Sequence, residues 1–264
     1  VKKFRYANET TADFGKSKTA LTGKFDQLLV KLQSRLNDTR YDFLLKPQKR
    51  VSSESLTGLM RDFVGLGSKR AKVTVLDISS VPFDVHPTVT AQIGRLAFEF
   101  NYWNPNCREF PLFVVAEEAH AYIPRDHVGG HQGTRRSFER IAKAGRKYAV
   151  GLCVVSQRPN ELSETVLAQC SSYICLRISN PDDQEYVRSL VPDSARGILE
   201  ALPSLAQGEA VAAGEAVPMP MRFQVTMPAP PPNAQSIEYA NMWAHGPEET
   251  DVEGIVDNWR KQRR

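Results

Sequence analysis

Long apolar runs and paired cysteines are both missing from this sequence of 264 residues. No uninterrupted hydrophobic stretch approaches the ~20 residues of a membrane-spanning helix, so we expect no membrane contact. The four cysteines lack the paired spacing of a metal site, and Cys153 and Cys175 lie in apolar segments. These features indicate buried free thiols in a reducing compartment, and we therefore expect a cytoplasmic protein.

A strong charge of either sign is missing as well. The sequence has 34 Lys and Arg against 30 Asp and Glu, which leaves a net charge of +4. This small excess permits nucleic-acid binding but does not argue for it. With 41% hydrophobic and 24% charged residues, the composition is that of a globular protein with one large domain or two small ones.

The most informative segment is a short apolar run that ends on two acids. Leu112–Ala116 is followed directly by Glu117 and Glu118. The run is typical of a strand buried on both faces of a parallel sheet, and open α/β sheets bind ligands at the carboxyl ends of such strands. Metal-assisted phosphoryl transfer uses a pair of this kind, one acid for the Mg²⁺ shell and one for the attacking water. The alternative is a strand that runs into a helix whose first turn favours Glu.

A second apolar strand, predicted at 150–155, ends on Ser156, Gln157, Arg158 and Pro159. Pro159 ends the strand and keeps Arg158 extended, so Gln157 is expected at an exposed strand tip. Its amide can hydrogen-bond both a phosphate group and a water molecule. The alternative is an ordinary polar exit from a strand, but two neighbouring tips, one acidic and one amide, favour a functional interpretation.

Apolar residues at helical spacing predict several helices along the chain. The first two cover about 25–36 and 56–63, and Pro87 opens a third. The predicted buried stripe of the third helix is Val89, Ile93, Leu96 and Phe100. Later helices are predicted at about 134–147, 164–169, 182–190, 194–201 and 252–263.

Extended segments alternate with these helices. They are predicted at Val73–Ile78, Leu112–Ala116, 150–155 and Tyr173–Leu176, with an antiparallel ribbon at 205–213 and 221–226. The alternation predicts an α/β fold with a mostly parallel sheet and helices on both faces.

Composition divides the chain into three parts. We expect a helical insertion at 1–70, the α/β core at 71–227 and, from a Pro-rich break onward, a C-terminal tail at 228–264. The tail carries Trp243 and Trp259, which need a surface to bury them. That surface belongs either to the same domain or to a neighbouring subunit.

Five blocks of this sequence resemble the HerA branch of the HerA/FtsK ATPases. They are Val75–Phe83, Glu117–His120, Gly145–Tyr148, Ser156–Pro159 and Arg177–Asp183. The resemblance covers roughly 20–226 and implies a RecA-like fold in a homo-oligomeric, hexameric ring that uses ATP and Mg²⁺ to move along double-stranded DNA. It also implies an effector partner, which is a NurA-like nuclease or, in anti-phage defence, a sirtuin-type enzyme.

The sequence departs from this family at one point, because the phosphate-binding pattern Gly-x-x-x-x-Gly-Lys-Ser/Thr is missing. Gly15, Lys16 and Ser17 match its end, but Thr10 stands where the first glycine belongs. The preceding residues are polar, whereas a phosphate-binding turn follows a buried strand. We therefore expect the C-terminal part of a longer ATPase, inactive on its own.

The resemblance also implies roles for single residues. Glu117 would hold Mg²⁺ through water, Glu118 would activate the attacking water, and Gln157 would sense the γ-phosphate. Arg146 would be an arginine finger that acts on a neighbouring subunit. Asp77 would contact the bound nucleotide, or would instead only cap the turn that follows it.

Several of these assignments have alternatives. Arg146 could be a cation that satisfies a helix end, with Lys147 and Arg140 as the other finger candidates. His120 has no second ligand at metal spacing, so a link from Glu118 to the following helix is the modest interpretation.

DNA contacts are assigned to basic residues in and beside a Gly-rich loop at 124–133. The candidates are Arg125, Arg135 and Arg136, together with His127 and His131. A solvated basic face is the alternative. Two further functions also stay open, namely a ring scaffold that recruits and activates an effector enzyme, and a conjugation- or secretion-type ATPase of the same superfamily.

Overall fold

The computed structural model describes residues 26–46, 53–68, 70–125, 132–191, 193–230, 239–246 and 250–261. These residues form two compact units. The first unit takes the described residues up to Thr57, those at 77–82 and those from Thr250 onward, and the second unit takes the others. The three predicted domains at 1–70, 71–227 and 228–264 stay a prediction. Within the described ranges, no helix has the length and apolar character needed to cross a bilayer.

The first unit is helical. It contains α1 (Asp26–Asn37), the short helices η2 (Thr39–Tyr41) and α2 (Asp42–Leu45), the beginning of α3 (Ser53–Phe63), and α10 (Val252–Lys261). The helices predicted at 25–36, 56–63 and 252–263 are thus confirmed. Tyr41 is buried beneath the Arg35 guanidinium, which lies 4.8 Å from the ring centre. No residue of α1 or α10 is buried, so the apolar sides of both helices are exposed.

The strand predicted at Val73–Ile78 is wrong. These residues form no β-ladder, and the Val73 and Val75 side chains are 75% and 82% exposed. An apolar sequence favours a strand, but the strand is stable only where its backbone N–H and C=O groups find partners.

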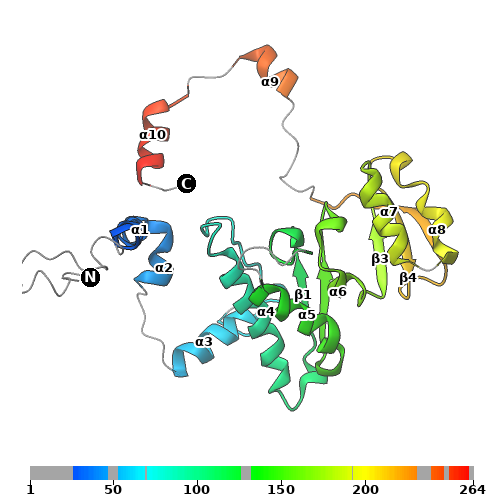
Figure 1. Ribbon diagram of the computed structural model, residues 1–264, viewed down its shortest axis with the longest axis horizontal. Coiled ribbons are helices and arrows are strands. Elements are labelled where there is room, and N and C mark those ends of the chain that lie inside the picture. Colours follow the sequence, from blue (N-terminus) through cyan, green and yellow to red (C-terminus); the bar gives the residue numbers. More distant parts are fainter. Residues whose placement is uncertain are drawn as a thin grey trace, which may run out of the picture. The chain divides into compact units, whose positions relative to one another are not determined.

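The centre of the second unit is a parallel pair of strands, β1 (Leu112–Ala116) and β2 (Val150–Val154), as predicted (Figure 1). Leu112 pairs with Val150, and Ala116 with Val154, so the carboxyl ends of both strands lie side by side. Helices α4 (His86–Tyr102) and α5 (Gln132–Ala144) form one buried cluster with these strands.

The prediction that Leu112–Ala116 is buried on both faces is wrong. Phe113 and Val115 point to the same side of β1 and are 69% and 62% exposed. Alternate residues of a strand face opposite sides, so only the side of Val114 packs against the buried cluster. The described residues therefore cover the Val114 side of β1 and leave its Phe113 side exposed, whereas every residue of β2 is at least half-buried.

Small residues set the contact between α4 and α5. The predicted stripe of Val89, Ile93, Leu96 and Phe100 is only half-buried, which corrects that prediction. The buried face is instead Thr90, Gly94, Ala97, Phe98 and Asn101. A Cβ atom on Gly94 would lie 3.3 Å from the Phe138 ring of α5, so the missing side chain lets the two helices approach closely.

A short helix, η5 (Gly145–Tyr148), links α5 to β2. A Cβ atom on Gly145 would lie 2.2 Å from the Val150 carbonyl oxygen, so this position requires glycine. Ala149 then takes a left-handed conformation with φ of 54°. The buried Asn101 amide donates to the carbonyl oxygens of Ala149 (3.3 Å) and Phe110 (3.0 Å), which ties α4 to the beginnings of both strands.

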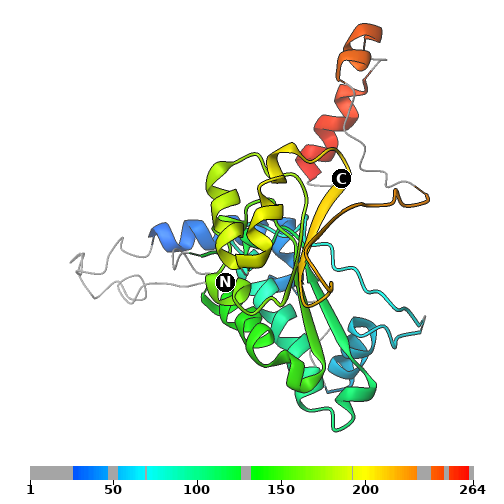
Figure 2. The same cartoon turned by 90° about the vertical axis from the view of Figure 1, so that its right-hand side faces the viewer.

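The second unit also contains an antiparallel sheet in the order β3–β4–β5 (Figures 1 and 2). Further elements of this unit, in chain order, are α6 (Glu164–Leu167), β3 (Ser172–Cys175), α7 (Pro181–Leu190), α8 (Asp193–Leu199), β4 (Glu209–Gly214), β5 (Met221–Gln224) and α9 (Tyr239–His245). The predicted ribbon is confirmed as β4 and β5. Residues of α7, α8, β3 and β4 share a second buried cluster. The fold is therefore mixed α/β, with one parallel strand pair among the described residues.

The close approach at Gly145 generates a prediction about stability. Replacing Gly145 with Ala should destabilise the protein by roughly 1–3 kcal/mol, because the backbone must move to relieve the clash. Gly197, which lies in α8 with open space around it, is the matched control. Gly197→Ala should be neutral or stabilising by up to ~1 kcal/mol, because Ala favours a helix. Urea unfolding of both variants measures the difference, and equal stabilities would contradict the packing at Gly145.

Candidate active site

Backbone hydrogen bonds hold the carboxyl ends of β1 and β2 together. The Val155 N–H donates to the Ala116 carbonyl oxygen (2.9 Å), and the Ala119 N–H donates to that of Val155 (3.0 Å). Between them the chain turns at Glu118, which has φ of 48° and ψ of 41°. A left-handed conformation at a residue with a side chain costs roughly 1–3 kcal/mol, so the surrounding contacts must impose it. The turn continues into a helix of three residues, η4 (Ala119–Ala121).

The Tyr122 side chain holds this turn in place. Its side chain is buried, and its hydroxyl donates to the Glu117 carbonyl oxygen at 2.7 Å. Burial, followed by the nearby Glu117 and Glu118 charges, raises the pKa of Tyr122 to about 12. The hydroxyl therefore stays protonated and remains a donor throughout the neutral range. The ring also lies 5.8 Å from the Phe138 ring, which connects the turn to α5.

The structure brings Glu118 and Gln157 together. The Gln157 Nε2 donates to the Glu118 Oε1 at 2.8 Å, and both side chains are exposed. Because the two strands are parallel and adjacent, their tips present these groups at the same edge. A carboxylate that accepts protons and an amide that both donates and accepts can together orient a water molecule and a phosphate oxygen.

Glu117 is exposed beside this pair. Its carboxylate makes no ion pair or side-chain hydrogen bond with any residue that the structure describes. Carboxylate oxygens that leave room for water are the ligands that Mg²⁺ prefers, so Glu117 fits a water-mediated magnesium site. The described residues contain no group of three or more potential metal ligands.

His120 and Ser156 complete the group, and sequence reasoning gave Ser156 no role. The His120 Nδ1 lies 3.1 Å from the Ser156 Oγ and 3.4 Å from the Glu118 Oε2. Ser156 directly precedes Gln157 on the same strand tip. The sequence signal for Ser156 was its position next to Gln157. An ordinary strand end without a function also carries polar residues at such a position.

Arg146 lies far from these groups. It precedes β2, whereas Glu118 and Gln157 follow the ends of β1 and β2. A strand of five residues rises about 3.3 Å per residue, so at least ~15 Å separates Arg146 from the strand tips. Its side chain is exposed and pairs with no described residue. Its placement therefore excludes direct contact with the Glu118 of the same subunit.

The two other finger candidates are already engaged. The Arg140 guanidinium lies 4.2 Å from the centre of the Phe98 ring and 3.9 Å from the Glu99 carboxylate. The Lys147 ammonium lies 5.4 Å from the centre of the Tyr148 ring. Of the three cations, Arg146 alone makes no contact with a partner among the residues that the structure describes.

Asp77 belongs to the first unit, where its carboxylate accepts a hydrogen bond from the Ser79 N–H at 2.9 Å. This contact caps the turn, which was the alternative to its nucleotide role. The Gly15–Ser17 segment, His127 and His131 lie outside the described residues.

Two of the three arginines assigned to DNA make several contacts within the second unit. Arg125 pairs with Glu164 at 2.5 Å and lies over the Tyr186 ring. Arg135 is 17% exposed and pairs with Glu139 at 2.6 Å. Arg136 is exposed and pairs with no described residue, so it has the freest guanidinium of the three.

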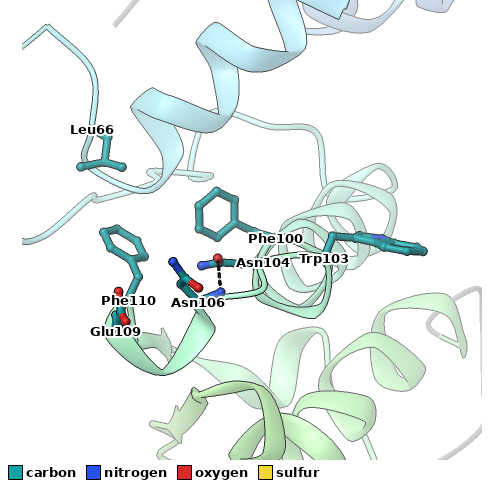
Figure 3. Close-up of a pocket in the computed structure, with 7 residues that line it drawn as sticks. All are labelled: Leu66, Phe100, Trp103, Asn104, Asn106, Glu109 and Phe110. Atoms are coloured by element: carbon teal, nitrogen blue, oxygen red, sulfur yellow. Dashed lines mark hydrogen bonds between the residues drawn. The ribbon is translucent and has the colours of Figure 1, made fainter.

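A separate cavity of about 550 Å³ lies at the other end of β1 (Figure 3). It is lined by Leu66, Phe100, Trp103, Asn104, Asn106, Glu109 and Phe110. The Phe100 and Phe110 rings meet edge to face at 5.9 Å. Phe110 precedes β1, so this cavity is not part of the site at the strand tips.

Comparison with known proteins finds no matching family model. The DNA double-strand break repair helicase HerA of Pyrococcus furiosus is 36% identical over 156 residues, which are 59% of this chain and 26% of that protein. HerA of Sulfurisphaera tokodaii is 32% identical over 200 residues, or 72% of this chain and 39% of that protein. A solved genome-packaging NTPase, B204 of Sulfolobus turreted icosahedral virus 2, is 14% identical with a TM-score of 0.46, covering 64% of this chain and 72% of that one.

This chain spans 26% and 39% of the length of the two HerA proteins. The alignments nevertheless cover more than half of this chain with each of the two HerA proteins. The resemblance predicted from the five sequence blocks is confirmed, and this chain is a relative of the HerA helicases.

Proposed function

We propose that the whole protein is an ATP-driven motor that moves along double-stranded DNA. The observation that carries this proposal is the contact between the Glu118 carboxylate and the Gln157 amide at the adjacent ends of two parallel strands. The relatives named as DNA repair helicases support the choice of DNA as the track. A RecA-like sheet is part of the proposal, and the parallel pair of β1 and β2, with α4 and α5 packed on it, supports that part.

Each group at the strand tips has a role in this proposal. Glu118 accepts a proton from the attacking water, and Gln157 contacts the γ-phosphate. Glu117 holds Mg²⁺ through water, and the ion when bound offsets the negative charge of the phosphates. The described residues include no Gly-rich phosphate loop, so this chain supplies the acids and the amide of the site and another segment supplies the phosphate cradle.

The role of Glu118 generates the first test of the function. In the full-length protein, Glu118→Gln should lower ATP turnover by roughly 10²- to 10⁴-fold, because an amide cannot accept the proton. Binding of Mg-ATP should persist, because Glu117 and Gln157 remain. Turnover is measured with a phosphate-release assay and binding with a fluorescent ATP analogue. The matched control is Glu200→Gln, at an exposed acid that follows α8, and it should behave as wild type. A Glu118→Gln protein with near wild-type turnover would rule out Glu118 as this base, whereas a wild-type protein without ATP turnover would favour the scaffold alternative.

Arg146 is proposed to act on the nucleotide of a neighbouring subunit. Two observations support this, namely its distance from the Glu118 of its own chain and its lack of a partner among the described residues. A guanidinium supplied by a neighbour neutralises charge that develops on the phosphate in the transition state.

Mixed oligomers test this role. Arg146→Ala subunits and Glu118→Gln subunits should each be inactive alone. When they are mixed, some interfaces pair an intact Glu118 with an intact Arg146 of the next chain, so part of the ATPase activity should return. Native mass spectrometry verifies that mixed oligomers form. No recovery in verified mixtures would leave Arg146 as a cation at the end of a helix.

The tail is proposed to join subunits of a ring. Helices α9 and α10 contain no buried residue, and their Trp243 and Trp259 side chains are 78% and 77% exposed. Val252, Ile255 and Trp259 recur at helical spacing on α10, so this helix has an apolar stripe with no cover on the described chain. A neighbouring subunit is the proposed cover, in a ring that we expect to be hexameric.

Removal of the tail tryptophans should weaken the oligomer. Each aromatic residue buries ~150–250 Å² at an interface, so Trp243→Ala combined with Trp259→Ala should shift the assembly toward monomers on dilution. Trp103→Ala is the matched control, because Trp103 is 76% exposed but belongs to the cavity of Figure 3. Light scattering over a dilution series gives the mass. An unchanged mass for the double variant would contradict the tail as a subunit contact.

The remaining partners follow from the family. We propose that Arg136 contributes a phosphate contact to DNA, because its guanidinium is exposed and unpaired among the described residues. An effector enzyme, either a nuclease or a sirtuin-type enzyme of anti-phage defence, is proposed to work with the ring. The cytoplasm is the proposed compartment.

A further inference from the structure

The two oxygens of the Glu118 carboxylate have different partners. The Oε1 accepts a hydrogen bond from the Gln157 amide at 2.8 Å, and the Oε2 faces the His120 Nδ1 at 3.4 Å. The Glu118 backbone is held by its left-handed conformation and by the bonds on either side of it. The side chain itself is 47% exposed, so its direction depends on these two neighbours.

His120 is held more firmly than the carboxylate it faces. Its side chain is 19% exposed, and it follows Ala119, which is fully buried. Its Nδ1 also lies 3.1 Å from the Ser156 Oγ. That oxygen in turn accepts a hydrogen bond from the Arg158 N–H at 3.0 Å, so the hydroxyl is fixed by the β2 tip. A single ring nitrogen thus faces both the Ser156 hydroxyl and the Glu118 carboxylate.

This arrangement favours one tautomer of the imidazole. An Nδ1 without a proton could accept a hydrogen bond from the Ser156 hydroxyl, but its lone pair would also face the negatively charged Oε2 at 3.4 Å, which is unfavourable. With a proton on Nδ1, the ring donates toward both the Ser156 and the Glu118 oxygens. In this arrangement His120 donates toward the Oε2 of Glu118, while Gln157 donates to the Oε1.

We propose that His120 is a positioning residue, which with Ser156 sets the direction in which Glu118 presents its carboxylate to the attacking water. The proposal rests on the proposed ATPase function, and adds to it a residue that does not touch the reacting atoms. Gln157 and His120 each interact with one oxygen of the Glu118 carboxylate, so rotation about the last bond of the Glu118 side chain is restricted. General-base catalysis requires a defined direction of attack. An enzyme whose Glu118 carboxylate is loosely held should therefore hydrolyse ATP more slowly.

Three substitutions in the full-length protein test this role. His120→Ala removes the donor. His120→Asn places an amide N–H near the position of Nδ1, whereas His120→Gln places it near that of Nε2. Because the two amides differ mainly in reach, the glutamine variant is the matched control for the asparagine variant.

The ATPase rates should separate these variants. His120→Ala should lower kcat by roughly tenfold to a hundredfold, the size expected for a reacting group displaced by about 1 Å, with little change in KM for ATP. His120→Asn should restore most of kcat and His120→Gln should not. Two results would overturn the proposal: an alanine variant with wild-type kcat, or equal rescue by both amides. Thermal unfolding of each variant identifies any loss of rate that comes from loss of the fold, and in that case the comparison of the two amides decides.

A second measurement does not depend on activity. Nuclear magnetic resonance of protein labelled with ¹⁵N-histidine reports which ring nitrogen carries the proton, and the signal missing from His120→Asn identifies His120. A proton on Nδ1 supports the proposal, and a proton on Nε2 alone contradicts it. A wild-type protein that hydrolyses no ATP would defeat the proposed function, whereas an active wild type with an unaffected alanine variant would defeat this inference alone.

Discussion

The pairing of β1 with β2 is the interaction on which the rest of the candidate site depends. Parallel strands in register end at the same edge, and the bonds from Val155 to Ala116 and from Ala119 to Val155 extend this pairing past the last paired residues. They bring two segments that lie about forty positions apart in sequence within one hydrogen bond of each other. A shift of register by one residue would place Gln157 on the wrong side of its strand, because side chains alternate along a strand.

The parts of the site that sequence reasoning reached are those that depend on local order. An apolar run that ends on two acids defines β1 and its tip, and Pro159 defines the tip of β2. The parts that it missed depend on tertiary contacts. The left-handed backbone of Glu118 and the contact between His120 and Ser156 involve residues whose types occur in many ordinary loops. The spacing of His120 and Ser156 in the sequence does not predict that they come into contact in the fold.

The errors in the fold have a common physical origin. Large apolar residues were expected to be buried, yet Val73, Phe113 and Val115 are exposed because the described residues place nothing over them. On α4, the packed face is marked by Gly94 and Ala97, which are weak signals in a hydrophobic pattern. Close packing depends on fit between surfaces, and small residues permit the closest fit. A single sequence shows which residues are apolar, but it does not show which of them are buried, because that depends on the segment that packs against them.

Two tyrosines, the buried Tyr122 and the half-buried Tyr173, make the stability of the protein depend on pH in the alkaline range. Burial raises the pKa values of Tyr122 and Tyr173 to about 12, and each hydroxyl donates to a backbone carbonyl oxygen. In the unfolded chain the same groups ionise near pH 10. Their contribution to stability is complete below that value and is lost as the pH rises toward 12. Ionisation of Tyr122 removes its hydrogen bond to the Glu117 carbonyl oxygen, so the turn that carries the two acids loses this support at alkaline pH and keeps it at acidic pH.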